Sequence, residues 1–280
     1  MYPTLFEIGG VTITTFGLMM LLAFVAGAWA MAVQFRVRAI APEAAWDMLV
    51  WIGLGGIAGA KLYYLILHPS EFAADPIGSL LSRGGLVWYG GFMGGVAAFY
   101  WQIRRRGLPL AQAFDSAAPG LAIAYAFGRM GCFLVGDDYG LPSNGPFAMV
   151  FPREAAIPST AGYLRSVGAD VPAQLPDAAL LAVHPTQLYE IAAALLIFAV
   201  LWKVSRPSLA PGRLFGLYLA LYGAERFLIE FLRAKDDHLL LGLTTSQGVS
   251  LVLIGVAAWL WVRPTPAQAG RTGRPAENPA

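Results

Sequence analysis

Charged side chains are scarce in this chain, since only 13% of its 280 residues are Asp, Glu, Lys or Arg. Soluble domains carry about 25% charged residues, so this sequence has too few of them to cover the surface of a soluble protein of this length. Hydrophobic residues make up 57% of the chain, and a chain this apolar does not stay disordered. The composition therefore predicts an integral membrane protein.

Cysteine is nearly absent, because Cys132 is the only one in the sequence. A single cysteine excludes an internal disulfide and a metal site built from several cysteines. An excess of charge of one sign is also lacking, with 19 basic residues against 17 acidic ones and no basic run longer than the three arginines at 104–106. We therefore expect no nucleic-acid partner.

Long apolar segments occupy most of the remaining sequence. A membrane-spanning helix needs about 20 mostly apolar residues. The sequence predicts seven such helices, over residues 11–33, 48–67, 85–103, 117–135, 188–202, 214–232 and 247–262. A buried or re-entrant segment is the alternative for the fifth and the seventh, which are short. The predicted fold class is an all-α polytopic membrane protein.

The basic residues are divided unevenly between the two ends of these segments. With the N-terminus outside, eleven of the 19 Lys and Arg residues fall on the cytoplasmic side, five on the outer side and three within the spans. Cytoplasmic loops carry an excess of Lys and Arg, so this distribution predicts an outer N-terminus and a cytoplasmic C-terminus. No basic residue precedes the first segment, so we do not expect it to be a cleavable signal peptide.

Residues 136–184 form the longest polar interval and are rich in proline and glycine. The interval is too long for a simple turn, and we expect a cap on the outer side that is partly ordered by Phe147, Phe151 and Tyr163. A plain surface loop is the alternative. Residues 1–263 are predicted to form a single integral membrane domain that includes this cap. We expect residues 264–280 to form a disordered cytoplasmic tail.

Arg129 lies inside the fourth predicted span, between Gly128 and Gly131. A charged side chain at the centre of a span costs about 2.5–3.5 kcal/mol or more, so it indicates a functional site by default. The guanidinium is a bidentate donor that suits phosphate oxygens. The alternative is a structural arginine that pairs with Asp115 or Glu230, or one that snorkels to the outer interface.

The sixth predicted span carries a polar stripe. Tyr222, Arg226 and Glu230 are spaced at i, i+4 and i+8, which places them on one face of a helix. Arg233 falls near the same face. Such a stripe must face the protein interior or a wet cavity, although an intrahelical ion pair used only for packing is the alternative. Glu225 lies off this stripe, and the sequence names no partner for it.

Residues 84–95 contain three glycine pairs around Tyr89. Paired glycines suit close helix contact or a broken helix start that lines a site, and an interfacial aromatic belt is the alternative for Tyr89. For Lys61, in the second predicted span, we expect a side chain that snorkels to the interface. Asp115 comes just before the fourth predicted span, where we expect it to cap that helix.

Taken in order, these segments resemble the prolipoprotein diacylglyceryl transferase family. The matching segments are residues 16–19 (FGLM), 84–95 (GGLVWYGGFMGG), 128–133 (GRMGCF) with Gly136 and Gly140, 146–152 (PFAMVFP), 184–190 (HPTQLYE) and 222–233 (YGAERFLIEFLR). Each segment is a weak signal alone. Six in the right order over nearly the whole chain make a specific one.

The resemblance implies a multi-pass enzyme of the bacterial inner membrane whose active site faces the periplasm. The family transfers the diacylglyceryl group of phosphatidylglycerol to the lipobox cysteine of a preprolipoprotein, forms a thioether and releases glycerol 1-phosphate. The implied partners are phosphatidylglycerol, the lipobox segment and membrane lipids. No metal or cofactor is implied, and we expect a monomer.

The resemblance also implies roles for individual residues. Arg129 and Arg226 match the essential arginines of the family, and Glu230 would hold Arg226 in place. Tyr89 is predicted as a fourth catalytic residue. The residues predicted to bind substrate, together with Arg129, are Tyr222, Gly140, Asp137, Gly90 and Gly91.

Four positions depart from the family pattern. Tyr89 stands where the family has a histidine, Phe16 where it has a tyrosine, Cys132 where it has an asparagine, and Asp137 where it has a glutamate. A phenol is a poor base at neutral pH. The departures leave open that the histidine is not the base, that Tyr89 replaces it, or that the chain is a divergent paralogue with another acceptor or no activity. A non-catalytic phospholipid-binding or transport protein is the alternative of another class. We expect Cys132 to be a bystander.

Overall fold

The structure is a computed structural model that describes residues 1–9, 11–82, 84–206, 209–233 and 242–263. Helices dominate these residues, with two short two-stranded sheets beside them. The helices of 17 residues or more are α1 (Thr15–Val37), α2 (Glu43–Leu67), α5 (Trp88–Arg105), α6 (Leu110–Val135), α8 (Thr186–Val204), α9 (Arg213–Ile229) and α10 (Thr245–Val262). These helices confirm the predicted class of a mostly helical membrane protein.

Five of these helices, namely α1, α2, α6, α8 and α10, are long and apolar enough to cross a membrane. The other two cover the third and sixth predicted spans. α9 has only 17 residues and carries Arg213, Glu225 and Arg226. α5 ends in a polar stretch that includes Arg104 and Arg105. The polar side chains make both helices less apolar than the five helices that can cross a membrane.

The first helix does not begin at residue 11, as predicted, because a β-hairpin comes before it. β1 (Thr4–Ile8) and β2 (Val11–Thr14) pair as an antiparallel hairpin, and the first predicted span is wrong by four residues at its start. All four residues of β2 (Val-Thr-Ile-Thr) are β-branched, which favours a strand. The Thr14 hydroxyl then accepts a hydrogen bond from the Gly17 amide at 3.0 Å and caps α1.

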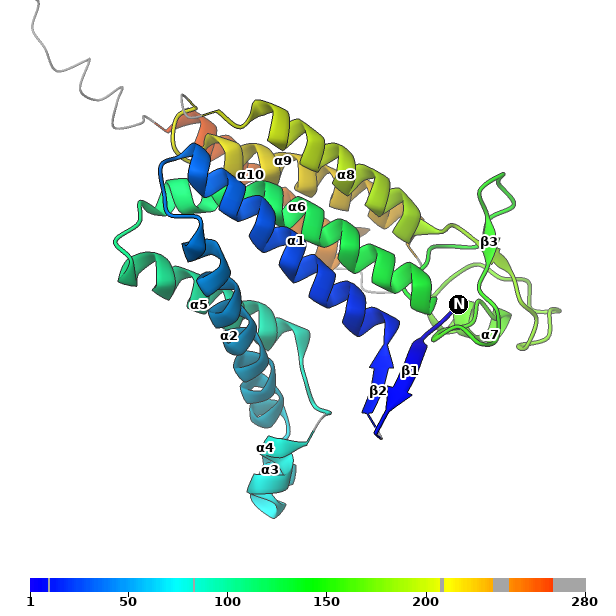
Figure 1. Ribbon diagram of the computed structural model, residues 1–280. Helices are drawn as coiled ribbons and strands as arrows, with labels where there is room; N and C mark the ends of the chain where they lie inside the picture. The colour runs from blue at the N-terminus through cyan, green and yellow to red at the C-terminus, as the bar shows by residue number, and fades with distance from the viewer. Residues whose placement is uncertain (10, 83, 207–208, 234–241, 264–280) are drawn as a thin grey trace, which may run out of the picture.

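α6 is the central helix of the larger group (Figure 1). It packs against α1, α8 and α9, and α10 pairs with α9. α2 and α5 form a separate pair, joined by the short helices α3 (Pro69–Ala74) and α4 (Pro76–Leu81). Figure 1 shows that this pair diverges from α1 toward the end where α3 and α4 lie.

Glycines bring the backbones of α2 and α5 into contact. A Cβ atom added to Gly90 would lie 2.3 Å from the carbonyl oxygen of Gly59, and one added to Gly94 would lie 2.1 Å from that of Gly55. Only glycine fits such an approach, which is the small-residue packing of membrane helices. The predicted close helix contact is confirmed. Gly90 and Gly91 therefore face α2, and their predicted contact with substrate stays a prediction.

Lys61 does not snorkel to the interface, because its side chain is only 7% exposed. Its ammonium donates hydrogen bonds to the carbonyl oxygens of Ser82 and Gly84, both at 2.9 Å, and to the Ser82 hydroxyl at 2.7 Å. These three oxygens replace the water that a snorkelling lysine would seek. Lys61 thus anchors the segment that leads into α5.

Asp115 caps a helix other than its own. α6 begins five residues earlier, at Leu110, so Asp115 lies inside it and is buried. Its carboxylate accepts hydrogen bonds from the amides of Gly212 at 2.7 Å and Phe215 at 2.8 Å. Those amides belong to the start of α9, where backbone donors have no partner within the helix. Asp115 thereby fixes the start of the helix that carries Arg226.

We expect Asp115→Ala to lower the free energy of unfolding by about 1–3 kcal/mol, since it leaves buried helix-start amides without an acceptor. Thermal unfolding of the detergent-solubilised protein measures the change. Asp47→Ala is the matched control, because Asp47 forms a solvent-exposed ion pair with Arg106 that contributes at most about 1 kcal/mol. Equal shifts for the two variants would contradict the capping role.

Residues 136–184, which we call the cap, enclose a small hydrophobic core of their own. The cap contains α7 (Ala161–Ser166) and the antiparallel pair of β3 (Met149–Val150) and β4 (Ala182–Val183). Phe151 is fully buried, and Tyr163 packs against the same cluster, as predicted. Phe147 is 72% exposed, so its predicted ordering role is wrong. The predicted tail, 264–280, lies outside the described residues.

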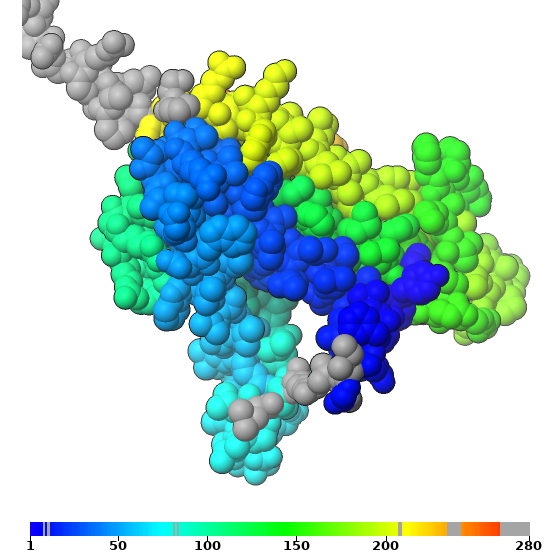
Figure 2. All heavy atoms as spheres, in the orientation of Figure 1, coloured from blue at the N-terminus to red at the C-terminus, as the bar shows by residue number. Residues whose placement is uncertain are grey.

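The cap and the N-terminal hairpin are neighbours. The side chain of Met1 packs against the cap cluster, and the Tyr2 amide donates to the Leu134 carbonyl at the end of α6, at 3.0 Å. In Figure 2 the green cap and the blue hairpin adjoin, while the cyan end formed by α3 and α4 stands apart from the cap. The cap and the hairpin thus both lie at the C-terminal end of α6.

Candidate functional site

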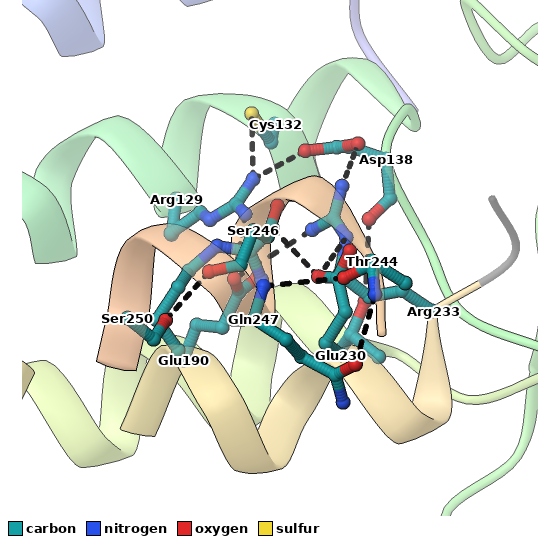
Figure 3. A network of polar contacts seen from close by, with 12 residues as sticks. Arg129, Cys132, Asp138, Glu190, Glu230, Arg233, Thr244, Ser246, Gln247 and Ser250 are labelled. Carbon is teal, nitrogen blue, oxygen red and sulfur yellow. Dashed lines mark hydrogen bonds and ion pairs between the residues drawn. The ribbon is translucent and has the colours of Figure 1, made fainter. Parts of the chain in front are cut away.

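Polar side chains from α6, α8 and α9 converge at the end of the helices next to the cap (Figure 3). Arg129 lies near the end of α6, Glu190 near the start of α8, and Arg226 near the end of α9. Glu230 follows in the 3₁₀ turn η1 (Glu230–Leu232). We call these residues, with Asp138 and Arg233, the arginine–carboxylate network.

Arg129 pairs with two carboxylates that the sequence did not identify. Its guanidinium lies 2.5 Å from Asp138 and 2.6 Å from Glu190. The predicted alternatives, Asp115 and Glu230 as partners or a side chain that snorkels, are wrong. A buried charge is stable only when it is paired and hydrogen-bonded, and Arg129 meets that condition through two separate segments of chain.

The turn after α6 aims Asp138 back at Arg129. Gly136 ends α6 with a positive φ of 81°, and Asp138 has a φ of 61°. Glycine adopts this left-handed region freely, and aspartate tolerates it better than most residues. The two residues reverse the chain within one short segment, so the Asp138 carboxylate faces both Arg129 and Arg233 (Figure 3).

Arg233 is at the centre of the network, although the sequence predicted it only near the polar stripe. Its side chain is 1% exposed and pairs with Asp138. It also lies 3.6 Å from a Glu190 oxygen and 3.8 Å from a Glu230 oxygen. The sequence offered one signal for this position. Arg233 follows Glu230 by three residues, a spacing at which two side chains on a helix can pair. Arg233 joins the carboxylates around Arg129 to the one that pairs with Arg226.

Arg226 forms the predicted i, i+4 ion pair with Glu230, at 2.7 Å. Its Nη2 also donates to the Ser246 hydroxyl at 3.0 Å. The other terminal nitrogen, Nη1, is buried and makes no hydrogen bond within the described part of the chain. Arg226 is therefore held firmly by one side of its guanidinium and keeps a donor on the other side.

Tyr222 joins the network through an aromatic contact. Its ring meets the Tyr125 ring edge-on, with centroids 5.3 Å apart. The Tyr125 hydroxyl donates to Glu190 at 2.8 Å and accepts from Arg129 at 3.3 Å. Tyr222, Arg226 and Glu230 thus lie on one face of α9 and η1, as their spacing predicted.

Gly140 lies where the cap crosses the ends of α8 and α9. A Cβ atom at this position would lie 2.3 Å from the Leu232 carbonyl oxygen and 2.7 Å from the Thr186 methyl carbon. The Gly140 amide donates to the His184 carbonyl at 2.9 Å, and the next amide, Leu141, donates to Leu232 at 2.7 Å. Gly140 therefore allows the close chain contact that holds Asp138 beside Arg233.

Asp137 borders the network from the cap side. Its backbone carbonyl accepts a hydrogen bond from the Gln187 amide group at 2.5 Å. Burial raises the pKa of its carboxyl above the ordinary value, and a hydrogen bond from the Cys132 thiol opposes that shift. Cys132 itself lies 3.8 Å from Arg129, so the residue expected to be a bystander is close to the network.

Tyr89, Gly90 and Gly91 are not brought to the network. The Tyr89 side chain is 62% exposed at the start of α5, where its ring meets Trp88 edge-on. No hydrogen bond or ion pair joins Tyr89 to the network among the residues that the structure describes. A catalytic role for Tyr89 stays a prediction.

The network can stabilise a developing negative charge. Donors that are fixed in place before the reaction are most effective in a site with little water, and Arg129, Arg226 and Arg233 are positioned by carboxylates on several segments. Planar guanidinium groups match the oxygens of a phosphate ester. The geometry therefore suits a reaction in which a phosphate-bearing group leaves.

Comparison with known proteins identifies the same family that the sequence motifs resemble. The model of the family described as "Prolipoprotein diacylglyceryl transferase" matches residues 3–263. A phosphatidylglycerol–prolipoprotein diacylglyceryl transferase of Trichormus variabilis is 33% identical over 276 residues, which cover 94% of this chain and 91% of the relative. The protein of the same name from Clostridium tetani is 31% identical and covers 91% of this chain and 96% of the relative. One from Pseudomonas fluorescens is 32% identical, with coverage of 94% and 95%.

Proposed function

This chain belongs to the prolipoprotein diacylglyceryl transferase family, and we propose that the arginine–carboxylate network is where it carries out the family reaction. The reaction moves the diacylglyceryl group of phosphatidylglycerol to the lipobox cysteine of a prolipoprotein. A thioether forms, and glycerol 1-phosphate leaves. The chain is therefore a membrane-embedded transferase of lipoprotein biosynthesis.

The buried Nη1 of Arg226, which has no hydrogen-bond partner among the described residues, is the observation that carries this site assignment. A buried donor without a partner is costly, and here it belongs to an arginine whose Nη2 pairs with Glu230 and donates to Ser246. A phosphate oxygen of phosphatidylglycerol would satisfy it. Arg129 would bind the same phosphodiester from α6, and both guanidiniums would stabilise the charge that develops on the leaving phosphate.

The remaining residues position these two arginines. Glu230 holds Arg226, while Asp138 and Glu190 hold Arg129. Tyr222 lines the face between the two arginines, and Gly140 allows the cap to close over them. Asp137 lies at the cap edge, where its carboxyl can contact the glycerol hydroxyls of the headgroup.

The proposed membrane arrangement has seven spans, with the N-terminus outside and the C-terminus in the cytoplasm. Its support is the seven described helices of 17 residues or more and the excess of Lys and Arg on the cytoplasmic side. Residues 1–263 form one membrane domain, and the cap 136–184 lies on the periplasmic side of a bacterial inner membrane. The active site then faces the periplasm, and the protein acts as a monomer.

A transfer assay tests the function directly. The purified protein is placed in vesicles of phosphatidylglycerol, or of phosphatidylcholine with the same acyl chains, together with a lipobox peptide. We expect the mass of the peptide to rise by one diacylglyceryl group, with one glycerol phosphate released per peptide, in phosphatidylglycerol vesicles only. Saturable binding of phosphatidylglycerol without release of glycerol phosphate would instead indicate a lipid-binding or transport protein.

Complementation distinguishes the enzyme from a divergent paralogue. A bacterial strain depleted of its own transferase should regain lipoprotein maturation when it expresses this chain. Failure to complement, in a strain where the protein is present and folded, would indicate another acceptor.

Tyr89→Phe tests the role predicted for that tyrosine. If the phenol takes part in proton transfer, the variant should lose at least about 100-fold in transfer rate, while Tyr89→His should keep its activity. Initial rates in phosphatidylglycerol vesicles measure the change. A rate near that of the unmodified protein for Tyr89→Phe would make Tyr89 a packing residue beside Trp88.

A further inference from the structure

We propose that Glu225 accepts the proton of the prolipoprotein thiol during transfer. The proposal rests on the proposed function, because it assigns the one part of the reaction that the network does not supply. A thiol must lose its proton to attack well, and arginines cannot accept a proton at neutral pH. The site therefore needs a base in addition to its cations.

The position of Glu225 on α9 aims its side chain toward α6. Tyr218, Tyr222, Glu225 and Ile229 recur at a spacing of three and four residues, so they share one face of the helix. Tyr218 packs in the core with residues of α6, and Tyr222 contacts Tyr125 of α6. Glu225 thus continues the buried face by one turn, toward the network end of the helix.

Both carboxylate oxygens of Glu225 are buried and make no hydrogen bond within the described part of the chain. An unpartnered carboxylate inside an apolar helix bundle is costly, so its presence indicates a use. The carboxylates of the arginine–carboxylate network, by contrast, are each paired with an arginine, namely Asp138, Glu190 and Glu230. A carboxylate paired with an arginine is a weaker base than one without such a partner, so Glu225 is a stronger proton acceptor than these three.

The charged and titratable groups that interact electrostatically with Glu225 come from three helices and the segment after η1. They are Arg129 and Tyr125 of α6, Glu190 of α8, Tyr218, Tyr222 and Arg226 of α9 itself, and Arg233. α10 contributes no titratable side chain. Glu225 is thus in electrostatic contact with the same arginines that would bind the phosphodiester.

A carboxylate also suits the task better than a phenol. A phenol keeps its proton at neutral pH and cannot take another from a thiol, whereas a carboxylate is available to do so. Tyr89 is moreover exposed at the start of α5. Glu225 combines the right chemistry with a position beside the arginines.

The step balances without any further reactant. The thiol proton passes to the Glu225 carboxylate as the sulfur forms a C–S bond to the glyceryl carbon that bears the phosphate ester. The C–O bond breaks, and its electron pair leaves with glycerol 1-phosphate. The proton on Glu225 then returns to solvent or to the departing phosphate.

The pH dependence of Glu225→Gln tests this role. About 3% of a thiol with a pKa of 8.5 is ionised at pH 7 and about three quarters at pH 9. Without its proton acceptor, the variant should be at least about 100-fold slower than the unmodified protein at pH 7. Its rate should rise about 25-fold between pH 7 and pH 9 as the peptide thiol ionises by itself, while the rate of the unmodified protein changes much less.

Two controls make the result specific. Glu154→Gln removes an exposed carboxylate of the cap and should leave the rate and its pH profile unchanged. Equilibrium binding of short-chain phosphatidylglycerol and thermal unfolding should be similar for Glu225→Gln and the unmodified protein. Glu225→Asp, which keeps the carboxylate, should retain more activity than Glu225→Gln.

Several outcomes would overturn the proposal while leaving the proposed function in place. A deficit of Glu225→Gln that is the same at pH 7 and pH 9 would show a structural role. A normal rate would show no role at all. A pH-dependent deficit in Asp137→Asn, without one in Glu225→Gln, would assign the proton to Asp137. Absence of transfer by the unmodified protein would instead overturn the proposed function itself.

Discussion

Arg129→Ala is expected to lower the rate of diacylglyceryl transfer at least about 1,000-fold. Loss of one preorganised donor to a developing oxyanion typically costs about 100- to 1,000-fold, and this variant also disturbs the positions of Asp138 and Glu190. Both carboxylates lie within 2.6 Å of the guanidinium in the native protein. Rates of glycerol phosphate release in phosphatidylglycerol vesicles measure the loss.

A second variant separates lost chemistry from lost folding. Removing one partner of a buried ion pair costs about 3–5 kcal/mol, so Arg129→Ala is also expected to lower the unfolding temperature. In the double variant Arg129→Ala/Glu190→Gln, one of the carboxylates that lost its arginine partner becomes neutral. This variant should recover part of the stability but none of the activity. Arg129→Lys keeps the positive charge but lacks the forked guanidinium group that reaches two carboxylates. Robust transfer by Arg129→Ala would remove Arg129 from the site.

Gly140→Ala is expected to lower both the transfer rate and the stability of the protein. The added methyl group would lie 2.3 Å from a backbone carbonyl oxygen of Leu232, and the backbone cannot yield as a side chain could. The cap must then move away from α9, and it carries Asp138 away from Arg233. A displacement of about 1 Å near a site can cost about 100-fold in rate. Overpacking of this kind also destabilises by about 1–3 kcal/mol.

Another glycine of the cap provides the control for this variant. Gly145 is exposed, and a Cβ atom there would meet only the hydroxyl of Ser143, at 3.3 Å. Gly145→Ala should therefore change neither the transfer rate nor the unfolding temperature by a measurable amount. Gly140→Ala with normal activity would show that the cap does not position the network.

Contacts between residues close in the sequence were predictable from spacing alone. The pair of Arg226 and Glu230 is one example, since residues four apart on a helix are neighbours whatever the rest of the chain does. The glycine pairs of residues 84–95 are another. Their spacing predicts close helix packing, and the structure places Gly90 and Gly94 against the backbone of α2.

Contacts between distant segments were not predictable in the same way. Arg129 was an evident candidate, but its partners Asp138 and Glu190 come from the cap and from α8. Asp115 looked like a cap for its own helix and instead caps α9, about 100 residues later in the chain. Lys61 looked free to reach the interface, and a loop of the protein satisfies it instead.

Composition and motif order together determined the class, the helices and the family of this protein. Scarce charge excludes a soluble fold, and the few ionisable residues inside apolar segments mark the site because each is costly there. The tertiary structure alone decided which charges meet. It put Arg233 in the centre of the network, left Tyr89 exposed, and buried the Glu225 carboxylate without a hydrogen-bond partner among the described residues. The physical reason is that ion pairing depends on distance between side chains, and the packing of α6, α8 and α9 sets that distance.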